Sequence, residues 1–104
     1  MVRLLQAKGR SMLSSLEVKT ERAVVKWWRG QGGFQLKLNL QGQRGWPDRL
    51  FLVSGGRAIF IEFKREGEEL RPLQEYRHRE LEKLGYRVYT CDSVASAKAI
   101  LASA

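Results

Sequence analysis

The sequence has very few of the residues that build disulfides or zinc sites. Cys91 is the only cysteine and His78 the only histidine among 104 residues. A single thiol cannot form an internal disulfide, and no Cys/His cluster indicates zinc. Cys91 falls in a predicted strand, where we expect it to act as a small buried apolar residue.

Long apolar stretches are also missing. Residues 1–15 contain no apolar run long enough for a signal peptide, and no stretch approaches the ~20 apolar residues of a membrane span. The sequence has no internal repeat and no low-complexity tract. These absences, with the lone cysteine, predict a protein of the reducing cytoplasm that has no membrane partner.

Acidic residues are scarce in the first half of the chain. The whole sequence has 19 Lys and Arg against 11 Asp and Glu, which gives a net charge of +8 and a pI near 10.2. Residues 1–47 hold nine basic and two acidic residues, whereas the other acids gather in residues 48–104. This charge suits a polyanionic partner such as nucleic acid, although solubility alone would also account for it.

Hydrophobic periodicity predicts an α/β fold in one domain spanning residues 1–104. A capping box at Ser14 and Glu17 starts a helix that ends at Gly30, and residues 1–13 are either a mobile basic arm or a short extra helix. The other predicted elements are strands at 34–40, 49–53, 58–64 and 86–91 and helices at 72–84 and 94–101. The order α-β-β-β-α-β-α implies a mixed sheet flanked by helices.

The sequence predicts which residues two of the helices turn toward the protein interior. Glu21 falls on the apolar stripe of the first helix, with Val24, Val25 and Trp28, and a carboxylate in such a place needs a reason. The helix at 72–84 is predicted to turn Leu73, Tyr76, Leu81 and Leu84 inward. His78 lies among charged residues of that helix, so we predict a surface position for it.

The second and third predicted strands form a hairpin around residues 54–56, Ser-Gly-Gly, because glycine reaches positive φ cheaply. A three-residue loop pairs Val53 with Arg57 and sets Asp48 opposite Glu62. A two-residue loop shifts the register by one residue and still leaves Asp48 beside Glu62. Both registers therefore bring two carboxylates together at the open end of the hairpin.

These carboxylates have the character of a metal site. Two neighbouring carboxylates repel each other unless a cation joins them, and Mg²⁺ and Mn²⁺ prefer such oxygen ligands. Asp48, Glu62 and the backbone carbonyl of Phe63 are the candidate ligands of an ion that would bind a phosphodiester and acidify a water. Lys64 shares a strand face with Glu62 and would orient that water or stabilise charge on phosphorus. Taken singly, each residue also fits a turn or an exposed strand edge.

The same residues resemble a known signature. Residues 45–48, Gly-Trp-Pro-Asp, followed by residues 62–64, Glu-Phe-Lys, resemble the G-x-P-D…E-x-K signature of VRR-NUC (virus-type replication-repair nuclease) domains. These domains belong to the PD-(D/E)XK superfamily, and the likeness covers roughly residues 15–95. It implies a restriction-endonuclease-like core and a DNA endonuclease dependent on Mg²⁺ or Mn²⁺. It also implies that Glu21 is an added metal or water ligand and that Gln74 lies beside the active site.

The resemblance further implies partners. Short standalone relatives occur in phages and bacteria and are similar to Holliday junction resolvases, which act as homodimers. The resemblance therefore implies a structure-selective enzyme of replication, recombination or repair that cuts branched DNA in a bacterial or phage-infected cell. Two active sites across a two-fold axis would cut two strands symmetrically.

Basic and aromatic residues near the proposed site are candidate DNA contacts. Lys37, Arg44, Arg49 and Arg65 flank the site as candidate phosphate contacts, and Trp46 would face DNA; ordinary surface roles are the alternative. Two other functions stay open. One is a non-catalytic DNA-binding module with a nuclease-like fold. The other is a restriction-type endonuclease, although 104 residues leave little material for base recognition.

Overall fold

The computed structural model describes the backbone of residues 2–104 and the side chains of residues 16–104. The side chains of the predicted basic arm, and Ser14 of the predicted capping box, lie outside this described part. The elements are α1 (Val2–Gly30), β1 (Phe34–Lys37), β2 (Arg49–Val53), β3 (Arg57–Phe63), α2 (Pro72–Lys83), β4 (Arg87–Cys91) and α3 (Val94–Ala102).

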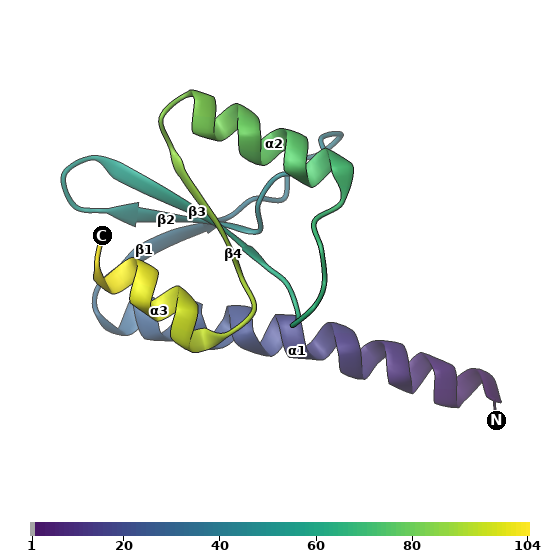
Figure 1. The fold of residues 1–104 in the computed structure, drawn as a ribbon. Helices are drawn as coiled ribbons and strands as arrows, with labels where there is room; N and C mark the ends of the chain where they lie inside the picture. Colours follow the sequence, from purple (N-terminus) through teal and green to yellow (C-terminus); the bar gives the residue numbers. More distant parts are fainter. Residues whose placement is uncertain (1) are drawn as a thin grey trace.

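The four strands form one mixed sheet in the order β1-β2-β3-β4. The β1–β2 and β2–β3 pairs are antiparallel, and β4 pairs with β3 in parallel after the α2 crossover. Helices α1 and α3 contact each other and cover one face of the sheet, whereas α2 lies over the other face (Figure 1). The predicted α/β class, element order and flanked mixed sheet are therefore confirmed.

The apolar core fills the layer between the sheet and the helices α1 and α3. Its strand residues are Phe51, Ile59, Ile61, Phe63 and Cys91, and its helix residues are Val24, Val25, Ala97 and Leu101. Burial of these side chains is the main force that fixes α1 and α3 on the sheet. The buried position predicted for Cys91 is confirmed.

The opposite face of the sheet is only partly covered. Phe34 lies opposite Leu52 in the register and Leu36 lies opposite Leu50, so these residues share a face. Phe34 is 75% exposed, and Leu36 and Leu52 are also exposed. Strand β1 is at the sheet edge, so an apolar strip lies open beside an unpaired strand edge in the described part of the chain.

Helix α1 is longer than the sequence predicts. It begins at Val2 rather than at Ser14, and its N-terminal turns extend past the sheet (Figure 1). Residues 2–13 include leucine, glutamine, alanine, lysine and methionine, which are all strong helix formers and explain a helix that continues through the predicted cap. The predicted end at Gly30 is confirmed.

Strand β1 is shorter than the predicted strand at residues 34–40 and ends at Lys37. The Leu38 N–H still donates to the Asp48 carbonyl oxygen at 3.0 Å. Pro47 precedes Asp48 and has no N–H to extend the ladder. The apolar alternation therefore runs on in the sequence after the pairing has stopped.

The described chain contains no helix with both the length and the apolar character needed to cross a membrane.

Candidate active site

The β2–β3 hairpin brings Asp48 and Glu62 together as the sequence predicts. Val53 pairs with Arg57 and Arg49 with Ile61, which is the register of a three-residue loop. One step further along the ladder, Asp48 meets Glu62. The Phe63 N–H donates to Asp48 Oδ2 at 2.7 Å, so the backbone of β3 holds the Asp48 carboxylate in place.

The two carboxylates are poorly solvated and have few partners. Burial raises the pKa of Asp48 to about 7, with a further rise from nearby Glu62 and Glu21 and an opposing effect of the Phe63 N–H. Glu62 is 3% exposed, and its Oε1 has no hydrogen-bond partner among residues 16–104. A buried, unpartnered carboxylate beside a second one is unfavourable unless a cation or a proton compensates it.

The residues present fit a hard divalent cation. The orphaned Glu62 oxygen and the raised pKa of Asp48 both indicate negative charge that lacks a counterion. Among residues 16–104, no three His, Cys, Asp or Glu side chains gather closely enough to hold an ion by themselves. An ion here would therefore complete its shell with water, backbone carbonyl or substrate oxygens, as Mg²⁺ commonly does.

Glu21 reaches the site from α1 but already has a partner. Its Oε2 forms an ion pair with Arg49 Nε at 2.5 Å, and Arg49 Nη1 donates to Gln35 Oε1 at 2.7 Å. Glu21 lies close enough to raise the pKa of Asp48. The structure therefore accounts for the carboxylate on the apolar stripe of α1 by this ion pair, and a metal-binding role of Glu21 stays a prediction.

Lys64 is buried at the end of β3, where it is 7% exposed. Two carboxyl groups lie near it, Glu17 of α1 and Glu68 of the loop after β3. Burial and then the nearby Glu68 carboxyl raise the pKa of Glu17, whereas the closeness of Glu17 lowers the pKa of Glu68. The ammonium group thus has acidic neighbours on its side of the site.

The loop before Asp48 is fixed against α2 by close packing. Gly45 has φ 85°, and a Cβ there would lie 2.7 Å from Leu73 Cγ and 2.9 Å from the Leu73 carbonyl oxygen. The Arg77 guanidinium lies 4.7 Å from the centre of the Trp46 ring, and its Nε donates to the Arg44 carbonyl. At position 45, the positive φ and the close contact with Leu73 therefore both require glycine.

Helix α2 turns a different face inward from the one predicted. Leu81 is buried as expected, but Leu73, Tyr76 and Leu84 are exposed. The surface position predicted for His78 is wrong, since it is 7% exposed and its Nε2 lies 3.6 Å from Glu62 Oε1. Polar residues occupy part of the inner face because that face meets buried carboxylates, and a hydrophobic pattern cannot detect this. The spacing i, i+4, i+7 from Gln74 through His78 to Leu81 is the signal that would have found it.

Gln74 lies in the first turn of α2, on the same face as His78. Its Oε1 accepts a hydrogen bond from the Arg71 N–H at 2.8 Å and so caps the helix. The predicted role of Gln74 beside the active site stays a prediction.

The predicted DNA contacts do not form one cluster. Arg49 is tied to Glu21, and Arg65 makes a long contact of 3.9 Å with Glu68. Lys37 and Arg44 are exposed, and Trp46 is half-buried under Arg77.

A basic groove that the sequence did not lead us to expect lies beside Arg49. It has a volume of about 380 Å³, and its lining includes Arg22, Lys26 and Arg29 of α1 together with Gln35 and Arg49. The three α1 cations are exposed and share one face at i, i+4, i+7. That spacing is visible in the sequence, but the apolar stripe of the same helix is the stronger signal there.

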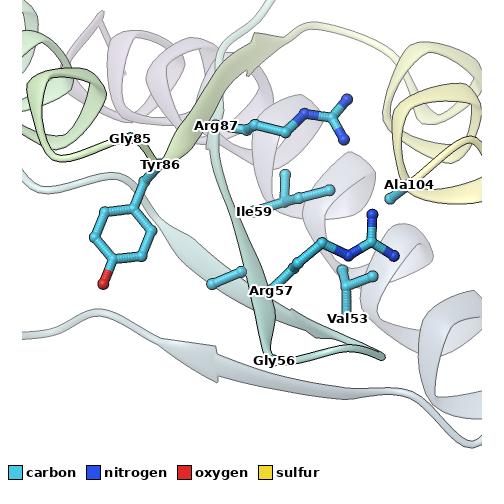
Figure 2. Close-up of a pocket in the computed structure, with 9 residues that line it drawn as sticks. Val53, Gly56, Arg57, Ile59, Gly85, Tyr86, Arg87 and Ala104 are labelled. Atoms are coloured by element: carbon cyan, nitrogen blue, oxygen red, sulfur yellow. The ribbon is translucent and has the colours of Figure 1, made fainter.

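A separate pocket of about 260 Å³ lies at the other end of the sheet. Arg57, Ile59 and Arg87 line it, together with Tyr86 and Ala104 (Figure 2). None of the described side chains that line this pocket is acidic, and none is a candidate site residue. It is therefore distinct from the carboxylate pair.

The chain is similar in sequence to one named protein and in structure to two solved domains. The chain is 39% identical over 77 residues to a protein named "Putative nuclease p44" from Acyrthosiphon pisum secondary endosymbiont phage 1, covering 74% of this chain and 83% of that protein. A solved "VRR_NUC domain" has a TM-score of 0.75 at 25% identity, over 84% of this chain and 95% of that one. A "VRR_NUC domain protein" has a TM-score of 0.71 at 19% identity, over 83% and 84% of the two chains. No family profile matches the sequence.

Proposed function

Since the chain belongs to the VRR_NUC family, we propose that it is a metal-dependent DNA endonuclease. The observation that carries this proposal is the meeting of Asp48 with buried Glu62, which has an unpartnered oxygen, at the end of a strand that continues into Lys64. The family relationship and the phage nuclease name of one relative support the same activity.

The proposed roles follow from position. Asp48 and Glu62, with the Phe63 carbonyl, would hold Mg²⁺ or Mn²⁺, and Glu21 would join them if its pair with Arg49 opened. The bound ion would act as a Lewis acid on a phosphate oxygen and lower the pKa of a water. Lys64 would place its ammonium beside the charge that develops on phosphorus. Gln74 is proposed to line the site from α2.

We infer that the substrate is DNA, bound through its phosphates. The net charge of +8 and the basic groove with Arg22, Lys26 and Arg29 support this inference. Arg49 lines this groove and also pairs with Glu21. A DNA backbone bound in the groove would therefore lie close to the carboxylates of the proposed active site. Lys37, Arg44, Trp46 and Arg65 are further candidate contacts at the rim.

We further propose that the substrate is branched DNA and that the enzyme acts as a homodimer. The exposed strip of Phe34, Leu36 and Leu52 beside the edge strand β1 would suit a second copy of the chain. Two copies would present two active sites, which suits paired cuts in a Holliday junction during replication, recombination or repair. We place this activity in the cytoplasm of a bacterial or phage-infected cell, where such DNA is found.

The test is cleavage of labelled four-way junction, flap, duplex and single-stranded DNA with Mg²⁺, with Mn²⁺ and with EDTA. We expect metal-dependent cutting, fastest on the junction, and a loss of at least about 100-fold in Asp48→Ala. Arg79→Ala, an exposed change on α2, is the matched control and should cut as the wild type does.

A different result would favour the alternative function. Tight DNA binding without cutting under either metal, unchanged in Asp48→Ala, would indicate a non-catalytic DNA-binding module. Equal cutting of all four substrates would remove the structure selectivity and leave a general endonuclease.

A further inference from the structure

Helix α2 places an imidazole directly against the buried carboxylate of the site. His78 Nε2 lies 3.6 Å from Glu62 Oε1, and the two side chains are 8% and 4% exposed. This separation is too long for a hydrogen bond, and neither atom has another partner among residues 16–104. Buried polar atoms without partners are rare in folded proteins and call for a specific reason.

The two site carboxylates differ in how they are held. Asp48 Oδ2 accepts the Phe63 N–H at 2.7 Å, which fixes its orientation. No comparable donor reaches Glu62 Oε1 in the part of the chain whose side chains are described. His78 is the group placed to supply one, since it approaches that oxygen from the facing helix.

We propose that His78 is a positioning residue for Glu62. The imidazole carries a proton on Nε2, and this N–H donates a hydrogen bond to Glu62 Oε1 after a small rotation of either side chain. Glu62 Oε2 is then left for the cation beside Asp48. Carboxylates that hold metal ions are commonly oriented by such a second group. The inference rests on the proposed function, because it assigns His78 a role toward the same ion.

The first experiment measures Mn²⁺ binding without DNA by titration calorimetry. His78→Gln keeps an N–H donor near the position of Nε2, whereas His78→Leu fills similar space without one. We expect His78→Leu to bind Mn²⁺ about 10- to 100-fold more weakly than the wild type, and His78→Gln to recover most of the loss. The exposed neighbour Arg79→Leu is the matched control and should bind as the wild type does.

The second experiment leaves the protein unaltered. His78 is the only histidine, so a ¹⁵N spectrum of the imidazole has one assignable ring. We expect the Nε2–H form, with a shift of Nε2 on addition of diamagnetic Mg²⁺. A ring protonated at Nδ1 alone would overturn the proposal, even if the variants failed to fold.

The outcomes separate this inference from the proposed function. Weak Mn²⁺ binding by the wild type, or unchanged binding in Asp48→Asn, would contradict the metal site itself. Normal wild-type binding that is lost in Asp48→Asn but kept in His78→Leu would contradict only the role of His78. Mn²⁺ binding by His78→Gln as weak as that of His78→Leu would also contradict this role, because an N–H donor at this position would then not restore the affinity.

Discussion

The two faces of the sheet have opposite chemistry. The face toward α1 and α3 is mainly apolar, with Phe51 fully buried among aliphatic and aromatic neighbours, and its ion pair of Glu21 with Arg49 satisfies both charges. The face toward α2 buries the polar Glu62 and His78 and leaves Phe34 open to solvent. One face thus stabilises the fold, and the other tolerates unpartnered charge, which is the arrangement expected where function rather than stability is served.

The largest change in stability is expected from a pair of substitutions at adjacent residues of β2, one on each face of the sheet. Phe51→Ala removes a ring from the packed face and should lower the free energy of unfolding by about 3–5 kcal/mol. Leu52→Ala, one residue along and 45% exposed, should cost less than about 1 kcal/mol. Urea denaturation followed by tryptophan fluorescence measures both, and equal losses would contradict the difference between the faces.

The loop over the polar face offers a second test. Gly45→Ala introduces a Cβ against the Leu73 backbone at a positive φ, so it should cost about 2–4 kcal/mol and displace Asp48. Gly42→Ala has a similar φ of 74° but open space around it, so only about 1 kcal/mol is expected. Only Gly45→Ala should lose DNA cleavage activity. Equal cleavage by both variants would mean that the packing of Gly45 against Leu73 does not position Asp48.

The raised pKa of Asp48 predicts a pH effect in the metal-free protein. Folded Asp48 keeps its proton up to about pH 7, whereas the unfolded carboxyl loses it near 3.8. Stability should therefore fall as pH rises through this window. Asp48→Asn should match the wild type near pH 4 and exceed it by on the order of 2 kcal/mol at pH 8, after allowance for partial exposure. Thermal melting in EDTA measures this, and a difference independent of pH would contradict it.

The smallest effect on stability is expected at the open edge. Phe34→Ser should change the unfolding free energy of the single chain by less than about 1 kcal/mol, because the ring is 75% exposed. It should weaken any self-association through this strip, whereas Leu84→Ser, 74% exposed elsewhere, should not. Sedimentation velocity distinguishes the two, and identical behaviour of both variants would remove this strip as the dimer surface.

Local patterns are sufficient to predict the hairpin. Side-chain alternation and the Ser-Gly-Gly loop leave two possible registers, and both bring Asp48 beside Glu62; the structure has the register of the three-residue loop. Asp92 and Ser93, which precede the predicted helix at 94–101, are both residue types that cap helices, and Ser93 is the one whose Oγ accepts the Ser96 N–H. These features depend on a few neighbouring residues, which the sequence contains directly.

Features that depend on distant packing escape prediction from the sequence. The inner face of α2 is set by the carboxylates it meets, so buried His78 and exposed Leu84 reverse the expectation from hydrophobicity. The ion pair of Glu21 with Arg49 joins residues 28 positions apart, and no periodicity encodes it. Helix α1 starts at Val2, so the capping-box spacing of residues 14 and 17 falls within a longer helix and does not mark its start.

The hairpin origin of the carboxylate pair has a consequence for the order of folding. Asp48 and Glu62 belong to one antiparallel hairpin, a local structure of the kind that closes within about 1–10 μs. The parallel β3–β4 pair forms only after the crossover connection through α2 has been made, which is a slower non-local step. We therefore expect the acid pair to assemble early and in water, and to lose its solvent only when α2 docks and His78 arrives.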